Sequence, residues 1–451
     1  MKKRKASLFC GVVFLIAIFG FLNSYGCSSS KVAQEIQYRK LSLEDYEDKV
    51  AGGWLGQAIG VLCEQWTEGK WQGEMVPFDL EDWYRMNPDI PRQVYMSIDT
   101  VAARESGDWS EYTTKLRKLA SNKQNWEIYT PVQMSDQDDL YIEFMFLHSI
   151  QTYGLDVTGT EIAEEWVKYL DPTRIWCANK AAYQNFEKGI WPPLSGHPSN
   201  TTWGDAIDFQ IEADLFGLIS PGLPRVSNAW GDEVGHIMNY GDGVYAGMAM
   251  AAMYGEAFFE SNPRKLVEYS LLAIPAESGY AEMVRDVIAL HDQYPDWQDA
   301  WKELEPKWGK KDGKLVSGVD VRINGAYIYM GLLYGGGDFW RTMNISMRCG
   351  RDSDCNPSSS AGILGTVLGM KGIPEKWAIL RDLPIENRAI KDIYPNPIDW
   401  DDILDATVEV GKRNILQNGG YIEDGMIYIP HRTPTSTPLE QTVWEETSQP
   451  E

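Results

Sequence analysis

The chain has 451 residues, of which 43% are hydrophobic, so it is long enough to bury a large core. Its 65 Asp and Glu residues outnumber its 41 Lys and Arg residues, which gives a formal net charge of −24. This balance argues strongly against a nucleic-acid-binding protein, which needs a basic face, and against broad adhesion to anionic lipid.

The first 26 residues have the features of a bacterial export signal. A basic start at 1–5 and an apolar stretch at 8–22 precede Ser24-Tyr25-Gly26-Cys27, which resembles a lipobox. We therefore predict a lipoprotein signal peptide over 1–26, lipidation of Cys27 and a tether over 27–40. This anchor would place the protein in the bacterial cell envelope, at the periplasmic or outer-membrane surface. Ordinary signal cleavage nearby stays an alternative, because Ser24 stands where Leu is usual.

Most of the chain after the tether has the periodicity of helices. The first such segment begins at Ser42 and carries Gly52, Gly56 and Gly60 on one face, which predicts close packing against another helix. Further helical patterns cover residues 139–153, 159–170, 178–187, 206–217, 243–258, 263–272, 280–291, 324–333, 338–347, 358–370 and 400–412.

Alternating strand patterns are few, and the main one lies near 425–429. The sequence therefore predicts an all-α protein with few short strands. We expect one domain over 41–430 and a loosely ordered tail over 431–451, where Thr and Pro are frequent.

Two acidic clusters lie about 215 residues apart, each at the start of a predicted helix. Asp138 and Asp139 begin one helix, and Asp352 and Asp354 stand just before another, which is rich in small residues. Packed carboxylates repel one another and lose hydration unless a cation offsets both costs. Carboxylate oxygens suit Mg²⁺, Mn²⁺ or Ca²⁺ better than zinc. The pattern therefore indicates a metal-dependent enzyme.

Two other structures could explain residues 352–356. Asp and Asn are common at helix starts, so local capping is the simplest alternative. A helix-loop-helix calcium site is excluded, because Pro357 stands where that loop needs glycine and Ile363 where it needs a bidentate Glu.

Four blocks of the chain resemble the ADP-ribosylglycohydrolase family. Residues 51–60, followed by Glu64, are similar to its glycine-striped first helix and the acidic residue after it. Gln137-Asp138-Asp139-Leu140 resembles its Thr-Asp-Asp-Thr, and residues 235–252 resemble a His-containing turn that leads into an alanine-rich helix. Residues 350–356, Gly-Arg-Asp-Ser-Asp-Cys-Asn, resemble its Gly-Gly-Asp-x-Asp-Thr-Asn.

The resemblance implies an orthogonal helical bundle with one or two Mg²⁺ or Mn²⁺ ions in a cleft. By motif position, the ligands would be Asp138, Asp139, Asp352 and Asp354. Glu64 would be a further ligand or the acid/base, so Glu64 and Asp139 are the catalytic candidates.

The chain departs from the family pattern at three positions. Gln137 and Cys355 stand where the family has metal-binding Thr hydroxyls, and Arg351 replaces a Gly. Gln137 can offer a carbonyl oxygen, whereas the Cys355 thiol is a poor match for a hard cation. Asp136 could also take a ligand role in a register shifted by two residues.

Further residues are candidates for contact with the substrate. Glu212 and Asp214 stand where the family has a cleft helix, His236 and Asp242 could line the same cleft, and Arg351 is the nearest cation to the motifs.

We therefore interpret the chain as a metal-dependent glycoside hydrolase that resembles ADP-ribosylglycohydrolases. Its expected partner is a small-molecule or glycan substrate in which an N- or O-glycosidic bond of a ribosyl, furanosyl or other extracellular sugar is cleaved. A different class stays open: a catalytically impaired, surface glycan-binding lipoprotein, which the residues Gln137 and Cys355 favour.

Overall fold

Two helices from opposite ends of the chain pack against each other through small residues. A computed structural model describes residues 36–64, 67–77, 79, 137–382 and 385–440, and in it α1 (Leu43–Glu64) lies along α18 (Cys355–Leu368). A Cβ added at Gly60 would lie 2.5 Å from the carbonyl carbon of Pro357, and one at Gly52 would clash with Gly365. The predicted role of the glycine face is confirmed, because only glycine permits this approach.

The described residues from Gln37 onward form one compact unit that is mostly helical. The remaining longer helices are α6 (Asp138–Tyr153), α7 (Gly159–Tyr169), α8 (Cys177–Glu187), α11 (Pro224–Gly235), α12 (Asp242–Ala257), α13 (Pro263–Ser270), α14 (Gly279–Gln293), α15 (Trp297–Trp308), α16 (Val321–Gly335), α17 (Phe339–Arg348) and α20 (Trp400–Gln417).

Short elements complete the fold. They are β1 (Tyr38–Ser42), η3 (Pro172–Arg174), α9 (Asp208–Ile211), α10 (Asp214–Leu218), β2 (Lys310–Lys311), β3 (Lys314–Leu315), η4 (Met370–Gly372), α19 (Glu375–Ala378), η5 (Ile379–Asp382), β4 (Tyr421–Glu423) and β5 (Met426–Pro430). The prediction of an all-α protein with few short strands is confirmed.

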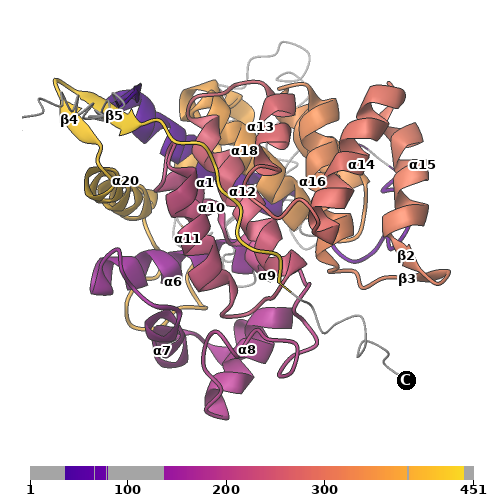
Figure 1. Ribbon diagram of the computed structural model, residues 1–451, viewed down its shortest axis with the longest axis horizontal. Coiled ribbons are helices and arrows are strands. Elements are labelled where there is room, and N and C mark those ends of the chain that lie inside the picture. Colours follow the sequence, from indigo (N-terminus) through magenta and orange to yellow (C-terminus); the bar gives the residue numbers. More distant parts are fainter. Residues whose placement is uncertain (1–35, 65–66, 78, 80–136, 383–384, 441–451) are drawn as a thin grey trace, which may run out of the picture. The chain divides into compact units, whose positions relative to one another are not determined.

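Helix α12 lies at the centre of the core. It contacts α9, α10, α11, α13, α16 and α18 (Figure 1). Its sequence is almost entirely Ala, Gly, Met and aromatic residues, and nearly every one of them is buried. A helix that is apolar on all sides must be surrounded by other elements, so α12 positions the helices that carry the acidic residues.

The strands form a small antiparallel sheet in the order β1-β5-β4. Tyr38 pairs with Pro430, and the pairing continues with His431 N donating to Gln37 O at 2.7 Å. The sheet therefore begins inside the stretch 27–40 that we expect to be a tether.

The described part of the C-terminal segment, 431–440, makes specific contacts with the helices. Asn228 Nδ2 donates to Thr435 O at 3.0 Å, and Gly241 N donates to Glu440 Oε2 at 2.6 Å. Glu440 Oε1 also lies 2.5 Å from His236 Nε2. Within the described residues, no helix is both long enough and apolar enough to cross a membrane. The expected signal peptide and Cys27 lie outside the described residues.

The sequence patterns located most helices but missed α11 and α15. Glycines at 231 and 235 and a proline at 306 weaken the local helix signal in these two segments. The pattern at 206–217 is two short helices, α9 and α10, that meet at Glu212 and Ala213.

Candidate metal centre and surrounding pocket

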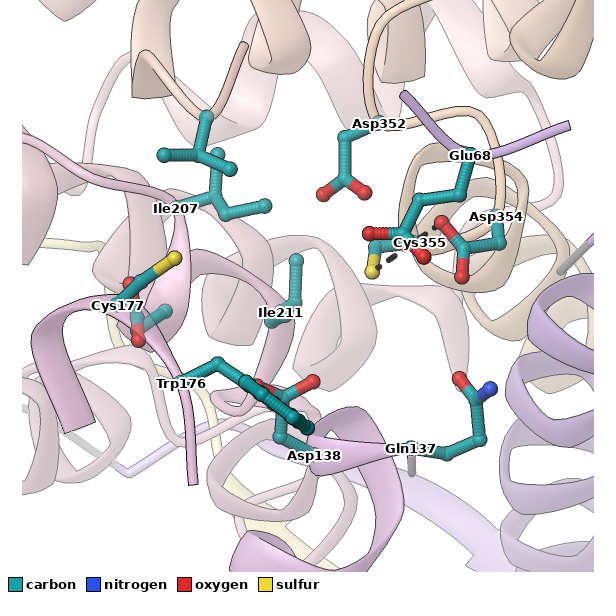
Figure 2. A pocket seen from close by; sticks show the side chains of 12 residues that line it. Glu68, Gln137, Asp138, Trp176, Cys177, Ile207, Ile211, Asp352, Asp354 and Cys355 are labelled. Atoms are coloured by element: carbon teal, nitrogen blue, oxygen red, sulfur yellow. Dashed lines mark hydrogen bonds between the residues drawn. The ribbon is translucent and has the colours of Figure 1, made fainter. Parts of the chain in front are cut away.

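A strained loop presents the acidic residues before α18. Gly350 and Arg351 have φ values of +89° and +60°, in the left-handed region. A Cβ at Gly350 would lie 2.7 Å from Trp71 O, which itself accepts a hydrogen bond from Arg351 N at 2.8 Å. Asn324 of α16 steadies the loop, because its Oδ1 accepts from Asp352 N at 3.3 Å and from Asn356 Nδ2 at 3.0 Å. The turn directs Asp352 into a pocket (Figure 2).

Arg351 itself points away from that pocket. Its fully buried guanidinium lies 2.5 Å from Glu305 of α15 and donates to Gly309 O at 2.9 Å. It is not among the residues that line the pocket. The expectation that Arg351 contacts the substrate is therefore corrected: it fixes the loop by an ion pair with a neighbouring helix.

The start of α6 brings the second acidic pair to the same place. Asp138 is half-buried and lines the pocket, beside the buried side chain of Gln137 (Figure 2). Asp139 is fully buried behind them, and neither of its carboxylate oxygens has a hydrogen-bond partner. The structure therefore brings residues 137–139 and 352–355 together, as the sequence interpretation requires.

The pocket has a volume of about 300 Å³ and a strongly acidic lining. Its described lining residues are Glu68, Gln137, Asp138, Trp176, Cys177, Ile207, Asp208, Ile211, Val319, Asp352, Asp354 and Cys355. Five of these are carboxylates, and no Lys, Arg or His is among them.

Burial and mutual repulsion disfavour the charged forms of these acids. The pKa of Asp352 is raised to about 8 by burial and by the nearby charge of Glu68. The pKa of Asp354 is raised by burial and by Asp352, and that of Asp138 by burial and by Asp139, Asp208 and Asp352. Burial raises the pKa of Asp139 to about 6, although the neighbouring Cys355 thiol and Ser358 hydroxyl oppose the shift. A bound cation would remove this penalty.

The donor atoms in the pocket fit a divalent cation. One oxygen of Asp352, one of Asp354 and the sulfur of Cys355 all lie within 4.8 Å of one another. Asp352 Oδ2 is buried and has no hydrogen-bond partner, and the same holds for both oxygens of Asp139. In a metal site, the ligand oxygens face the ion, so they have no hydrogen-bond donors when the ion is absent.

The opposite wall of the pocket contains an acid that the sequence analysis missed. Asp208 begins α9, and its Oδ1 accepts a hydrogen bond from Asn179 N at 3.0 Å. Its Oδ2 is buried without a partner, and burial raises its pKa to about 6. Cys177, at the start of α8 with φ of +39°, lines the same wall. No motif marked Asp208, because its partner lies 29 residues earlier in the chain.

Glu212 and Asp214 lie behind this wall rather than in the lining. Glu212 accepts a hydrogen bond from Asn179 Nδ2, and Asp214 accepts one from Tyr254. Both acids are fully buried, and burial raises both pKa values well above the usual range. Glu143 accepts from Asp214 N at 3.2 Å, so these groups form a network beneath the pocket.

His236 and Asp242 lie outside the described lining of the pocket. His236 binds Glu440, and Asp242 Oδ1 accepts a hydrogen bond from Tyr280 N at 3.0 Å. The structure does not bring these two residues into the described lining, and both join chain segments at helix ends.

Two further candidates fall where the structure gives no side chain. Glu64 is the last residue of α1, but its side chain is outside the described part, and Asp136 is outside the described residues altogether. Glu68, four residues after Glu64, is the acid from this region that lines the pocket (Figure 2).

Comparison with known proteins gives one clear match. A family model described as ADP-ribosylglycohydrolase matches residues 42–398, which is most of the chain. Among solved structures, 37 chains match. One belongs to an "ADP-ribosylglycohydrolase-related protein complex", with 14% sequence identity and a TM-score of 0.48 over 82% of this chain and 99% of that one. No curated protein matches.

Proposed function

Because the chain belongs to the ADP-ribosylglycohydrolase family, we propose that it is a hydrolase of glycosidic bonds that depends on one or two divalent metal ions. The observation that carries the proposal is the meeting of Asp138 with Asp352 and Asp354 in one pocket. Asp352 and Asp354 are buried, and Asp352 Oδ2 has no hydrogen-bond partner, which is costly unless the site binds a cation.

The residues suit distinct tasks in such a reaction. Asp138, Asp139, Asp352 and Asp354 would hold the ion, for which Mg²⁺ or Mn²⁺ is the choice that carboxylates favour. A bound ion supplies Lewis acidity and a fixed point for two sugar hydroxyls.

Asp208 is our candidate for the acid/base. Its Oδ1 is held by a backbone N–H, so Oδ2 is left to exchange a proton with the leaving group or with water. The raised pKa of about 6 suits that exchange near neutral pH. Glu64, the acid that the family motif indicates, stays a second candidate for this role.

The pocket favours a neutral sugar over a substrate with a pyrophosphate. Its described lining has five carboxylates and no cationic side chain, so two phosphate charges would meet repulsion. Trp176 lines the pocket and is 43% exposed, which gives a sugar ring a face to stack on. We therefore propose a furanoside or another extracellular glycan as substrate, rather than an ADP-ribosyl group.

An envelope location agrees with this substrate. We propose that the chain is exported, lipidated on Cys27 and held at the membrane surface. A Cys27→Ser variant should then appear in the soluble fraction, whereas the unchanged protein should need detergent for release.

The alternative is a glycan-binding protein that has lost catalysis. Gln137 favours it, because an amide replaces a hydroxyl of the family motif beside the acidic pair. Tight glycan binding by the metal-loaded protein, with no turnover on any furanoside, would decide for this function.

The decisive experiment compares two isosteric variants. The mature protein, loaded with Mn²⁺, is assayed on a panel of furanosides and on ADP-ribosyl-arginine. Asp352→Asn should lower kcat/KM by on the order of a thousandfold, because it removes a charge that would bind the ion. Asp242→Asn, outside the pocket lining, should stay close to the unchanged protein. Full activity in Asp352→Asn would exclude the proposed site.

A further inference from the structure

The sulfur of Cys355 lies among the carboxylates of the pocket. Cys355 is the first residue of α18 and is 7% exposed. Its Sγ is 3.8 Å from Asp354 Oδ1, and it lies within 4.8 Å of one oxygen each of Asp352 and Asp354. A thiol in this position can contact an ion that is bound by those two oxygens.

Independent groups aim at the same place. Asp352 Oδ2 is buried without a hydrogen-bond partner and points into the pocket in Figure 2. Both oxygens of the fully buried Asp139 are also unpartnered. The Cys355 S–H can donate to Asp354 Oδ1, but Asp352 Oδ2 and both oxygens of Asp139 are left without donors, and a cation would satisfy them.

A sulfur ligand limits the kinds of cation that this site can bind well. Mg²⁺ binds oxygen almost exclusively and dehydrates reluctantly, so a sulfur in its coordination sphere replaces a water at a loss. Zn²⁺ and Co²⁺ accept mixed oxygen and sulfur ligands, with Mn²⁺ between these extremes.

We propose that Cys355 binds the ion of this pocket as a thiolate, and that the site therefore prefers a borderline cation such as Zn²⁺ or Co²⁺ to Mg²⁺. On binding, the S–H proton passes to solvent and a sulfur–metal bond forms, with no change of oxidation state. This inference rests on the proposed metal dependence, but it adds the thiolate as a ligand and replaces the Mg²⁺ that carboxylates alone would favour by Zn²⁺ or Co²⁺.

Cys177 provides a matched control within the same pocket. It lines the opposite wall, next to Asp208, and does not belong to the group formed by Asp352, Asp354 and Cys355. In Figure 2 the two sulfurs lie on different sides of the pocket. A thiolate signal from the proposed ligand must therefore depend on Cys355 and not on Cys177.

The test uses the full mature protein, freed of metal by a chelator and titrated with Co²⁺ alone. A thiolate ligand gives an intense sulfur-to-cobalt charge-transfer band in the near ultraviolet, whereas oxygen ligands give only weak visible bands. We expect the band in the unchanged protein and in Cys177→Ser, and its loss in Cys355→Ser. Bound Co²⁺ without the band, or a band that survives Cys355→Ser, would overturn the proposal.

A second measurement begins with the unchanged protein, so its first result does not depend on folding of Cys355→Ser. Competition titration of the unchanged protein should show Zn²⁺ bound more tightly than Mg²⁺ by well over about a hundredfold, and Cys355→Ser should lose more than about tenfold of the Zn²⁺ affinity. Equal binding of the two ions would contradict a thiolate ligand.

The inference and the proposed function fail in different ways. Metal-dependent turnover by a protein that shows no charge-transfer band would support the hydrolase proposal and exclude the thiolate ligand. The band without turnover of any sugar would support the thiolate ligand and exclude the hydrolase proposal. A protein that binds no Co²⁺ and shows no metal-dependent turnover would remove both.

Discussion

The body of helix α18 and its N-terminal start differ in how their residues are packed. Along its length, α18 packs on α1 with glycine and alanine in backbone contact, as at Gly56 and Ala361, and the contact leaves no room for a methyl group. At its start, the side chains of Asp352 and Asp354 are buried with like charges beside them and too few donors. The comparison teaches that the contact between α1 and α18 stabilises the fold, whereas the buried acids of the pocket lower its stability, a cost that the proposed cation would offset.

The largest effect is expected from crowding the contact. Gly56→Ala places a Cβ against the backbone of Ala361, and the helices must separate to admit it. We expect a loss of about 3 kcal/mol in the free energy of unfolding, measured by urea titration.

Gly255→Ala is the matched control, because its Cβ would meet Ser220 O at 3.1 Å, a contact that a small shift relieves. It should lie within about 1 kcal/mol of the unchanged protein, since alanine also raises helix propensity. Equal stability of the two variants would contradict the claim that the close contact between α1 and α18 stabilises the fold.

Metal removal tests the pocket side. If the ion binds only the folded chain, Mn²⁺ at a hundred times its dissociation constant should add about 2.7 kcal/mol of stability, and chelation should remove it. Thermal unfolding with and without chelator measures this. Asp352→Asn should lose most of the gain, and an unchanged melting temperature on chelation would contradict a metal at this site.

The chelated protein should lose stability as the pH rises. The pKa values of Asp139 and Asp208 are raised to about 6, and that of Asp352 to about 8. Since the folded chain then holds protons that the unfolded chain releases above about pH 4, stability falls from about pH 4 towards about pH 8.

Urea titration at a series of pH values measures this fall in the free energy of unfolding. Saturation with Mn²⁺ is the control, because the ion binds the ionised acids and should flatten or reverse the slope. If the chelated protein instead gains stability over this range, the fold already stabilises the ionised forms of these acids without a metal.

The smallest effect concerns the start of α1. Ser42 Oγ accepts a hydrogen bond from Asp45 N at 2.9 Å, which is an N-cap. Ser42→Ala should cost about 1 kcal/mol in unfolding free energy, with no change in metal affinity. Loss of metal binding in this variant would mean that the pocket and the contact are not separate regions.

The sequence predicted the features that repeat locally or carry their chemistry in neighbouring residues. The glycine face of α1 and the acidic pairs at 138–139 and 352–354 are of this kind. It missed Asp208, whose partner Asn179 belongs to another helix, because no spacing in the chain records that contact. It placed Arg351 in the pocket, since a motif does not reveal that the side chain turns towards Glu305.

The central claim is that the starts of α6 and α18 share a cation. Crystals of the mature protein soaked in Mn²⁺ and measured at the manganese absorption edge test it most directly. The account predicts an anomalous peak within bonding distance of Asp138 or Asp139 and of Asp352 or Asp354. A map with manganese bound elsewhere and no peak between these acids would contradict it.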